Sequence, residues 1–152
     1  MPKQVLRWSL SILLAALCGG CNDSPSEPRG GSVELRLALS QESVSSSGQL
    51  DWTLELTNRS SQTVRYDFVS SCQFNFKVFR GAELIWDDSL QQICLTALTS
   101  IVLEPGESRF RTGSWEVRDA NGGVPPGPYE ARGELLTEPR VESRSVPFRV
   151  QG

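Results

Sequence analysis

Apolar and polar side chains alternate at every second residue through most of this chain, and the alternation limits its fold more than any other feature. The runs lie at residues 33–39, 50–57, 64–68, 74–78, 129–135 and 146–150. A strand with one buried face and one solvated face has this period of two, whereas a helix repeats about every 3.6 residues. No segment beyond the first 21 residues shows a helical stripe. We therefore predict an all-β domain.

Glycine and proline turns separate these runs. Gly81 divides a hairpin, and residues 104–107 and 125–128 carry the turn sequences Glu-Pro-Gly-Glu and Pro-Pro-Gly-Pro. The serine-rich segment 43–47 is interpreted as a loop, and residues 90–97 as an irregular crossover. Eight or nine short strands at this spacing, each with a solvated face, predict an Ig-like antiparallel β-sandwich.

The N-terminus has the organisation of an export signal. Lys3 and Arg7 precede an apolar run at residues 10–17, which is too short to span a bilayer comfortably. Two glycines and Cys21 follow, so the segment resembles a bacterial lipoprotein signal in which Cys21 becomes the lipidated first residue. The position three before that cysteine is usually aliphatic, and here it is Cys18. Ordinary secretion is the alternative.

Three segments follow from this assignment. Residues 1–20 are the predicted signal peptide, residues 21–31 the lipidated cysteine with a flexible linker, and residues 32–152 a single β-sandwich domain. We expect an exported protein at the cell membrane or outer membrane, facing the periplasm or the exterior. If the chain is secreted without a lipid, it is soluble.

Cys72 and Cys94 remain once the signal is removed and Cys21 is lipidated. Disulfides persist in exported proteins, so we predict that these two cysteines pair. The closed loop would stabilise the fold by about 3 kcal/mol. Two free thiols are the alternative.

Composition argues against several functional classes. The chain has no histidine, which removes the commonest general base and the usual zinc and copper sites. Without residues 1–20 it carries 13 basic and 18 acidic side chains, interspersed and with a net charge of −5. We therefore expect no catalytic residues, metal, cofactor, small-molecule substrate or nucleic acid. Lys77 is interpreted as solvated, and Trp52, Trp86 and Trp115 as core residues.

An ordered set of motifs covers about residues 50–136. In sequence they are Leu54-Glu55-Leu56-Thr57-Asn58, Gln73-Phe74-Asn75-Phe76-Lys77-Val78, Gly81 before Leu84-Ile85-Trp86, Leu103-Glu104-Pro105-Gly106-Glu107, Trp115 and Gly127-Pro128-Tyr129. This order resembles the BsuPI-type intracellular proteinase inhibitor family. The resemblance implies an Ig-like sandwich and a protein partner, with a serine proteinase as the candidate. The chain departs from the family in its export signal, in its two cysteines and in Asn75, where aspartate is frequent.

Two loops are candidates for the partner contact. Residues 91–100, held at Cys94 by the predicted disulfide, offer Leu95 or Leu98 as an apolar anchor. Residues 119–128, stiffened by prolines, offer Val124. The alternative function is a non-catalytic Ig-like binding or scaffolding module on the cell envelope, without inhibitory activity.

Overall fold

Strands make up nearly all the regular structure in the computed structural model, which describes residues 32–119 and 122–152. The bounds are β1 Val33–Leu39, β2 Ser43–Ser45, β3 Gln49–Asn58, β4 Val64–Phe68, β5 Phe74–Arg80, β6 Glu83–Asp87, β7 Thr99–Leu103, β8 Ser108–Glu116, β9 Arg118–Asp119, β10 Gly122–Gly123, β11 Gly127–Leu135, β12 Val141–Glu142 and β13 Val146–Gln151. One 3-10 helix, η1 (Asp88–Leu90), interrupts the strands of the described residues. The predicted all-β, Ig-like sandwich is confirmed.

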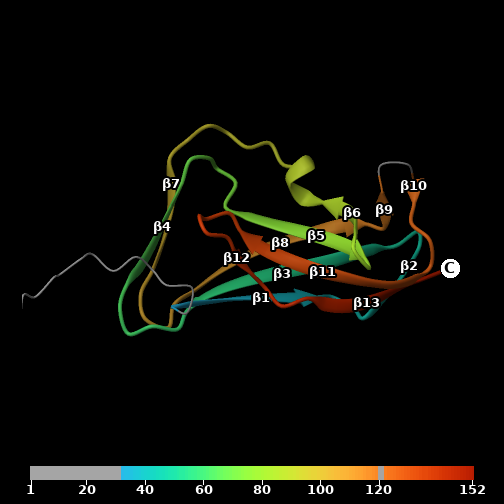
Figure 1. Ribbon diagram of the computed structural model, residues 1–152, viewed down its shortest axis with the longest axis horizontal. Helices are drawn as coiled ribbons and strands as arrows, with labels where there is room; N and C mark the ends of the chain where they lie inside the picture. The colour runs from blue at the N-terminus through green and yellow to red at the C-terminus, as the bar shows by residue number, and fades with distance from the viewer. Residues whose placement is uncertain (1–31, 120–121) are drawn as a thin grey trace, which may run out of the picture.

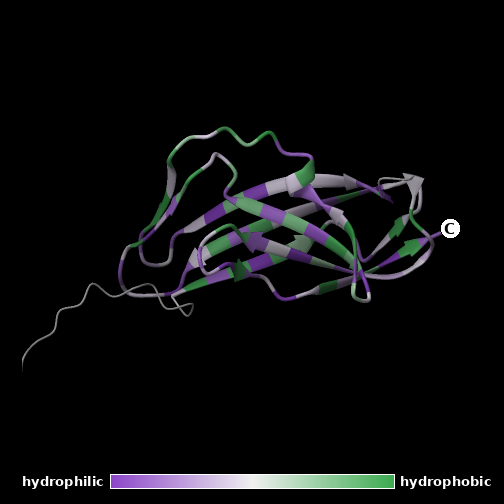
Figure 2. Cartoon of the chain, turned by 45° about the horizontal axis from the view of Figure 1, so that its top comes forward, coloured by the Kyte–Doolittle hydropathy of each residue, from purple (hydrophilic) through white to green (hydrophobic). Residues whose placement is uncertain are grey.

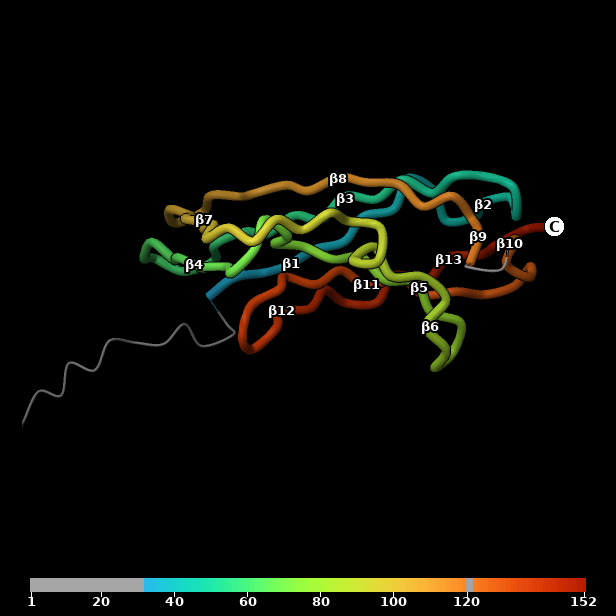
Figure 3. Tube along the Cα trace, turned by 90° about the horizontal axis from the view of Figure 1, so that it is seen from above, coloured from blue at the N-terminus to red at the C-terminus, as the bar shows by residue number. Residues whose placement is uncertain are grey.

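The strands form two layers (Figures 1 and 3). One layer has the order β1-β3-β8, and the other the order β2-β13-β11-β5-β6 with β12 beside β11. Strands β4 and β7 form a separate antiparallel ribbon at one end of the elongated domain (Figure 1). The chain must therefore cross from β6, at an edge of the second layer, to β7 in the ribbon.

Aromatic side chains join the two layers through the core. Trp52 of β3 stacks on Phe76 of β5, with ring centroids 4.9 Å apart. Trp115 of β8 meets Phe148 of β13 edge to face at 6.2 Å. Trp52 and Trp115 are buried, as expected, and Trp86 is partly buried against the core.

Asn58 shows why strand β3 ends in asparagine. Its side chain is fully buried, and its amide nitrogen donates to the carbonyl oxygens of Gln62 and Leu103 at 2.7 and 3.0 Å. Its amide oxygen accepts a hydrogen bond from the Ser60 backbone N–H at 2.9 Å. Every hydrogen-bonding group of the amide is therefore engaged in holding the turn after β3 against β7.

The serine-rich segment differs from the prediction of a loop. Residues Ser43–Ser45 form β2, which pairs with β13 and is parallel to it. A three-residue strand with one apolar side chain, Val44, is too short to show an alternating pattern. Its position depends on the neighbouring strand β13, so local sequence alone could not reveal it.

The predicted signal peptide, Cys21 and linker lie outside the described residues. Among the residues that the structure does describe, no helix has the length and apolar character needed to cross a membrane.

Candidate functional site

The segment between η1 and β7, residues 91–98, forms what we call the crossover loop. It carries three exposed apolar side chains, Ile93, Leu95 and Leu98, with exposed fractions of 89%, 65% and 89%. Figure 2 shows this hydrophobic stretch running along the outside of the domain. Scattered exposed apolar residues are ordinary, but several in one segment indicate a contact surface.

A disulfide and two hydrogen bonds hold the middle of the crossover loop. Cys94 is bonded to Cys72, with 5.4 Å between their Cα atoms, which confirms the predicted pairing. The Leu95 backbone N–H donates to Ser71 Oγ at 2.9 Å, and its carbonyl oxygen accepts from the Ser71 N–H at 3.0 Å. Leu95 is thus fixed through its main chain while its side chain stays exposed.

Two further attachments hold the loop on either side of Leu95. Gln92 Nε2 donates to the Phe74 carbonyl at 3.3 Å. Thr99 Oγ1 donates to the Ser70 carbonyl at 2.7 Å and accepts from Gln73 Nε2 at 3.1 Å. The loop is therefore held alongside residues 70–74 on both sides of the disulfide.

The start of the crossover loop is fixed by a cap on η1. The Asp87 carboxylate accepts hydrogen bonds from the Ser89 N–H at 2.9 Å and from Asn75 Nδ2 at 3.0 Å. Asn75 Oδ1 also accepts from the Ser89 N–H, at 2.9 Å. Burial alone would raise the pKa of Asp87, but the hydrogen bonds from Ser89 and Asn75, together with the Lys77 charge, hold this pKa below its usual value. The cap is therefore an ionised carboxylate at neutral pH.

A paired carboxylate lies beside Asn75. The Glu134 side chain is 8% exposed and pairs with Lys77 Nζ at 2.7 Å and with Arg140 Nη1 at 3.0 Å. Lys77 is only 17% exposed, which corrects its interpretation as a solvated side chain. Asn75 is 2% exposed, although the alternating pattern places it on the wet face. The short helix η1, which precedes the crossover loop, lies over this part of β5, since its Ser89 bonds to Asn75, and it contributes to the burial of that face.

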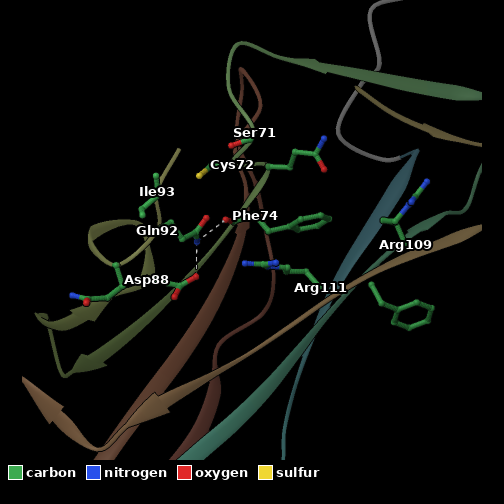
Figure 4. Close-up of a pocket in the computed structure, with 11 residues that line it drawn as sticks. Ser71, Cys72, Phe74, Asp88, Gln92, Ile93, Arg109 and Arg111 are labelled. Atoms are coloured by element: carbon green, nitrogen blue, oxygen red, sulfur yellow. Dashed lines mark hydrogen bonds between the residues drawn. The ribbon is translucent and has the colours of Figure 1, made fainter. Parts of the chain in front are cut away.

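A hollow of about 440 Å³ separates the start of the crossover loop from β8. Asp88, Ile93 and Arg111 are among its lining residues, and Figure 4 shows Arg111 directed toward Asp88. Burial raises the pKa of the Asp88 carboxyl, against the opposing effects of a hydrogen bond from Gln92 and the charge of Arg111. The hollow is open and polar, and it adds a concave surface next to the apolar side of the loop.

The three predicted contact residues differ in their exposure to solvent. Leu95 and Leu98 are exposed on the crossover loop, whereas Val124 is 3% exposed and belongs to the core. Tyr129 Oη donates to the carbonyl of the next residue, Pro125, at 2.6 Å, and Val124 itself is a member of the hydrophobic core. The expectation that residues 119–128 offer Val124 to a partner is therefore corrected.

The residues that position the crossover loop were not recognised from the sequence. Ser71 lies next to Cys72, and a residue beside a disulfide is placed to pair with the segment across it. That adjacency is a usable signal for Ser71. Gln92 and Asn75 carry no comparable signal, because their contacts depend on the path of the crossover.

No group of three or more cysteine, aspartate and glutamate side chains able to hold a metal ion occurs among residues 32–119 and 122–152. Gln92 and Leu95 bond to residues 71–74 beneath the loop, and its large exposed side chains include the apolar Ile93, Leu95 and Leu98. The arrangement is suited to contact with a protein surface.

Residues 37–140 match the family described as BsuPI, intracellular proteinase inhibitor, which is more than half of the 152-residue chain. The chain belongs to the BsuPI family. The resemblance seen in the order of motifs is thereby confirmed, and the family supports a function of the proteinase-inhibitor type with a protein partner. No curated protein matches the chain.

Solved structures are similar to this BsuPI-family chain at low sequence identity. Spo0M, a sporulation control protein from Bacillus subtilis, has a TM-score of 0.51 at 8% identity, over 80% of this chain and 50% of Spo0M. The alkylpurine DNA glycosylase AlkC from Pseudomonas fluorescens has 0.50 at 11%, over 80% and 31%. The CARDB domain of PF1109 from Pyrococcus furiosus has 0.44 at 12%, over 78% and 87%. The chain thus spans half or less of Spo0M and AlkC, and these likenesses concern the fold alone.

Proposed function

We propose that this chain is an exported, lipid-anchored inhibitor that binds a proteinase through the crossover loop. The observation that carries the proposal is the exposed Leu95, held by a disulfide at the preceding residue and by two main-chain hydrogen bonds to Ser71. Membership of the BsuPI family supports the inhibitory activity in general.

Order in the free loop is what makes this segment suitable for inhibition. Binding a flexible loop requires its conformational entropy to be lost on association, which weakens the complex. The crossover loop is already held at Gln92, Cys94, Leu95 and Thr99. An enzyme cleft can therefore close on it with little further ordering.

Leu95 is the better anchor of the two exposed leucines. Both hydrogen-bonding groups of its main chain are engaged, whereas residues 96–98 make no hydrogen bond within the described part of the chain. Leu98 is more exposed, but fixing it in a cleft requires more ordering of the chain. We therefore place the centre of the contact at Leu95.

The inhibitor is expected to act non-catalytically, since the loop offers an apolar surface and the chain contains no histidine. Its partner would be met at the envelope, although the family description names an intracellular inhibitor. The N-terminal signal with Cys21 supports the envelope location.

Leu95→Asp tests the proposal. Purified wild-type protein is expected to inhibit at least one serine proteinase in a panel of secreted and periplasmic enzymes, and Leu95→Asp to raise the inhibition constant at least about tenfold. The charge would have to be desolvated in the cleft. Leu84→Asp, at an exposed leucine on β6, is the matched control and should inhibit like the wild type. A folded wild-type protein that inhibits none of the panel, but captures another envelope protein, would support the binding-module alternative instead.

The proposed lipid anchor can be detected directly. Mass spectrometry of the mature protein is expected to find Cys21 as the first residue, carrying a diacylglyceryl group. Cys21→Ala should then leave the protein in the soluble fraction or unprocessed, because one or two acyl chains supply the membrane affinity. A mature chain that starts elsewhere and carries no lipid would establish ordinary secretion.

A further inference from the structure

Strand β8 is an edge of the sandwich. Its layer has the order β1-β3-β8, and no other strand of the described residues pairs with the far side of β8. The hydrogen bonds at its two ends show which main-chain groups face β3. Before β8, the Glu107 carbonyl accepts from the Asn58 N–H at 3.0 Å, and after β8, the Val117 N–H donates to the Gly48 carbonyl at 3.0 Å.

The far side of β8 presents main-chain groups that a further strand can pair with. Along an antiparallel strand, the residues whose N–H and C=O groups face the neighbour alternate with residues whose groups face away from it. Since Glu107 and Val117 face β3, the odd-numbered residues between them face it as well. The N–H and C=O groups of Phe110, Thr112 and Ser114 therefore point outward from the sheet.

Two arginines without ion-pair partners lie on the inner face of this edge. Arg109 and Arg111 stand opposite Leu56 and Leu54 of β3, whose side chains are buried in the core, so both arginines lie on the face turned toward the other layer. Because β8 is at the edge, both remain exposed. Neither belongs to an ion pair among the described residues.

The hollow of about 440 Å³ beside β8 reaches this edge and is positively charged. Arg109, Phe110 and Arg111 all line it, and Figure 4 shows both arginines on its β8 side. Asp88 is the acidic residue in the lining, so two arginines and one aspartate give a net charge of +1, in a chain whose net charge is −3. A carboxylate entering the hollow can accept charge-assisted hydrogen bonds from a guanidinium group.

The outer face of the same stretch is apolar at one position. Phe110 lies between the two arginines in sequence, so its ring is on the opposite face of β8, and it is 59% exposed. Side chains that face one another across neighbouring strands contact each other, and aromatic rings pair well with β-branched residues. A strand added to β8 would therefore place its alternate residues against the arginines and the residue between them against Phe110.

The charge changes sign further along the edge. A second hollow, of about 470 Å³, is lined by Asp87, Asp88, Glu116 and Asp119 together with a single arginine. Carboxylates of a bound segment would be repelled there, so they belong opposite Arg109 and Arg111.

A second copy of the chain is a poor occupant of this edge. Antiparallel pairing of two β8 strands would gather Arg109 and Arg111 of both copies on one face of the joined sheet, where like charges are destabilising. Inward-directed charges commonly protect edge strands from such pairing. A segment that carries carboxylates on that face removes the repulsion.

We propose that the edge of β8 binds an extended segment of a partner protein in which two acidic residues flank an apolar one. The segment adds a strand beside β8, its carboxylates pair with Arg109 and Arg111, and its apolar side chain covers Phe110. This surface is distinct from Leu95, and the proposal does not depend on inhibition through that residue.

A peptide binding assay tests the charge preference. The probe is a labelled synthetic peptide of about eight residues, in which two glutamates flank a valine and the rest are serine and threonine, and a second peptide has lysines in place of the glutamates. By fluorescence anisotropy, the wild type should bind the glutamate peptide at least about tenfold more tightly. The double variant Arg109→Glu/Arg111→Glu should reverse this preference. Arg144→Glu/Arg149→Glu, at two exposed arginines outside β8, is the matched control and should bind like the wild type.

Thr112→Pro tests the main-chain pairing. Thr112 is exposed, and proline removes its outward N–H, which makes no bond to β3, so the edge strand can accommodate it. The glutamate peptide should bind about tenfold more weakly to Thr112→Pro, whereas Thr112→Ala keeps the N–H and should bind like the wild type. Thermal unfolding of each variant checks that it is folded.

The possible results separate the occupants of the edge. A wild type that binds the glutamate peptide no more tightly than the lysine peptide would overturn the proposal, as would a folded charge-reversal variant that keeps the wild-type preference. Equal binding by Thr112→Pro and Thr112→Ala would overturn the strand pairing. A wild-type dimer that Thr112→Pro dissociates in sedimentation would assign the edge to a second copy instead. Leu95→Asp should bind the glutamate peptide like the wild type, since the two surfaces are distinct.

Discussion

A variant in which alanine replaces both Cys72 and Cys94 is expected to lose about 3 kcal/mol of unfolding free energy and most of its inhibitory potency. The two residues are 22 apart in the sequence, and the bond between them restricts the unfolded chain over that length. For a domain of this size, a change of about 3 kcal/mol lowers the melting temperature by about 10 °C. Potency falls because Cys94 no longer holds the residue next to Leu95.

The two effects can be measured apart. Thermal unfolding gives the change in stability, and inhibition is then assayed well below the variant's melting temperature, where nearly all molecules are folded. A higher inhibition constant under those conditions reflects a change in the crossover loop and not global unfolding. Reduction of the wild-type disulfide should reproduce both changes. If the folded variant inhibits as strongly as the wild type, the disulfide contributes only to stability, and the ordering argument for Leu95 is incorrect.

The strands of the sandwich were predictable because their pattern is local. The core face of β3 shows in every second residue from Leu50 to Leu56, and the structure buries all four of these apolar side chains. Asn75 and Lys77 follow the same alternation on β5 yet are shielded from solvent. Their environment is set by contacts with β6, β11 and the short helix η1, and these contacts are non-local.

Part of the candidate site was also predictable, because its signal lies in the sequence itself. The prediction of export, together with two cysteines remaining in the mature chain, pointed to the Cys72–Cys94 bond, and that bond indicated which loop would be held. The sequence could not distinguish Leu95 from Val124 as an exposed residue, since both are apolar residues in irregular segments. Val124 packs into the hydrophobic core, and this burial depends on tertiary contacts.

Trp115→Ala is expected to lower the free energy of unfolding by about 4 kcal/mol, more than the loss of the disulfide. Trp115 is 1% exposed, its ring meets Phe148 of the opposite layer, and its Nε1 donates to the Arg118 carbonyl at 2.9 Å. Replacement leaves a cavity between the two layers and removes that hydrogen bond. Trp86→Ala, at a partly buried tryptophan, should lose distinctly less, and denaturant unfolding of both variants measures the difference.

Trp115 also tests whether the family motifs belong to the scaffold of the fold or to the surface that contacts the partner. Trp115 belongs to the ordered set of motifs that the family shares, but it is buried and has no exposed surface to offer a partner. Trp115→Phe retains most of the apolar volume, so it should fold with reduced stability and inhibit the target with an unchanged inhibition constant. Leu95→Asp should show the reverse, with normal stability and weak inhibition. A Trp115→Phe variant that is folded but does not inhibit would mean that a change in the core alters the crossover loop. Scaffold and contact surface would then not be separable.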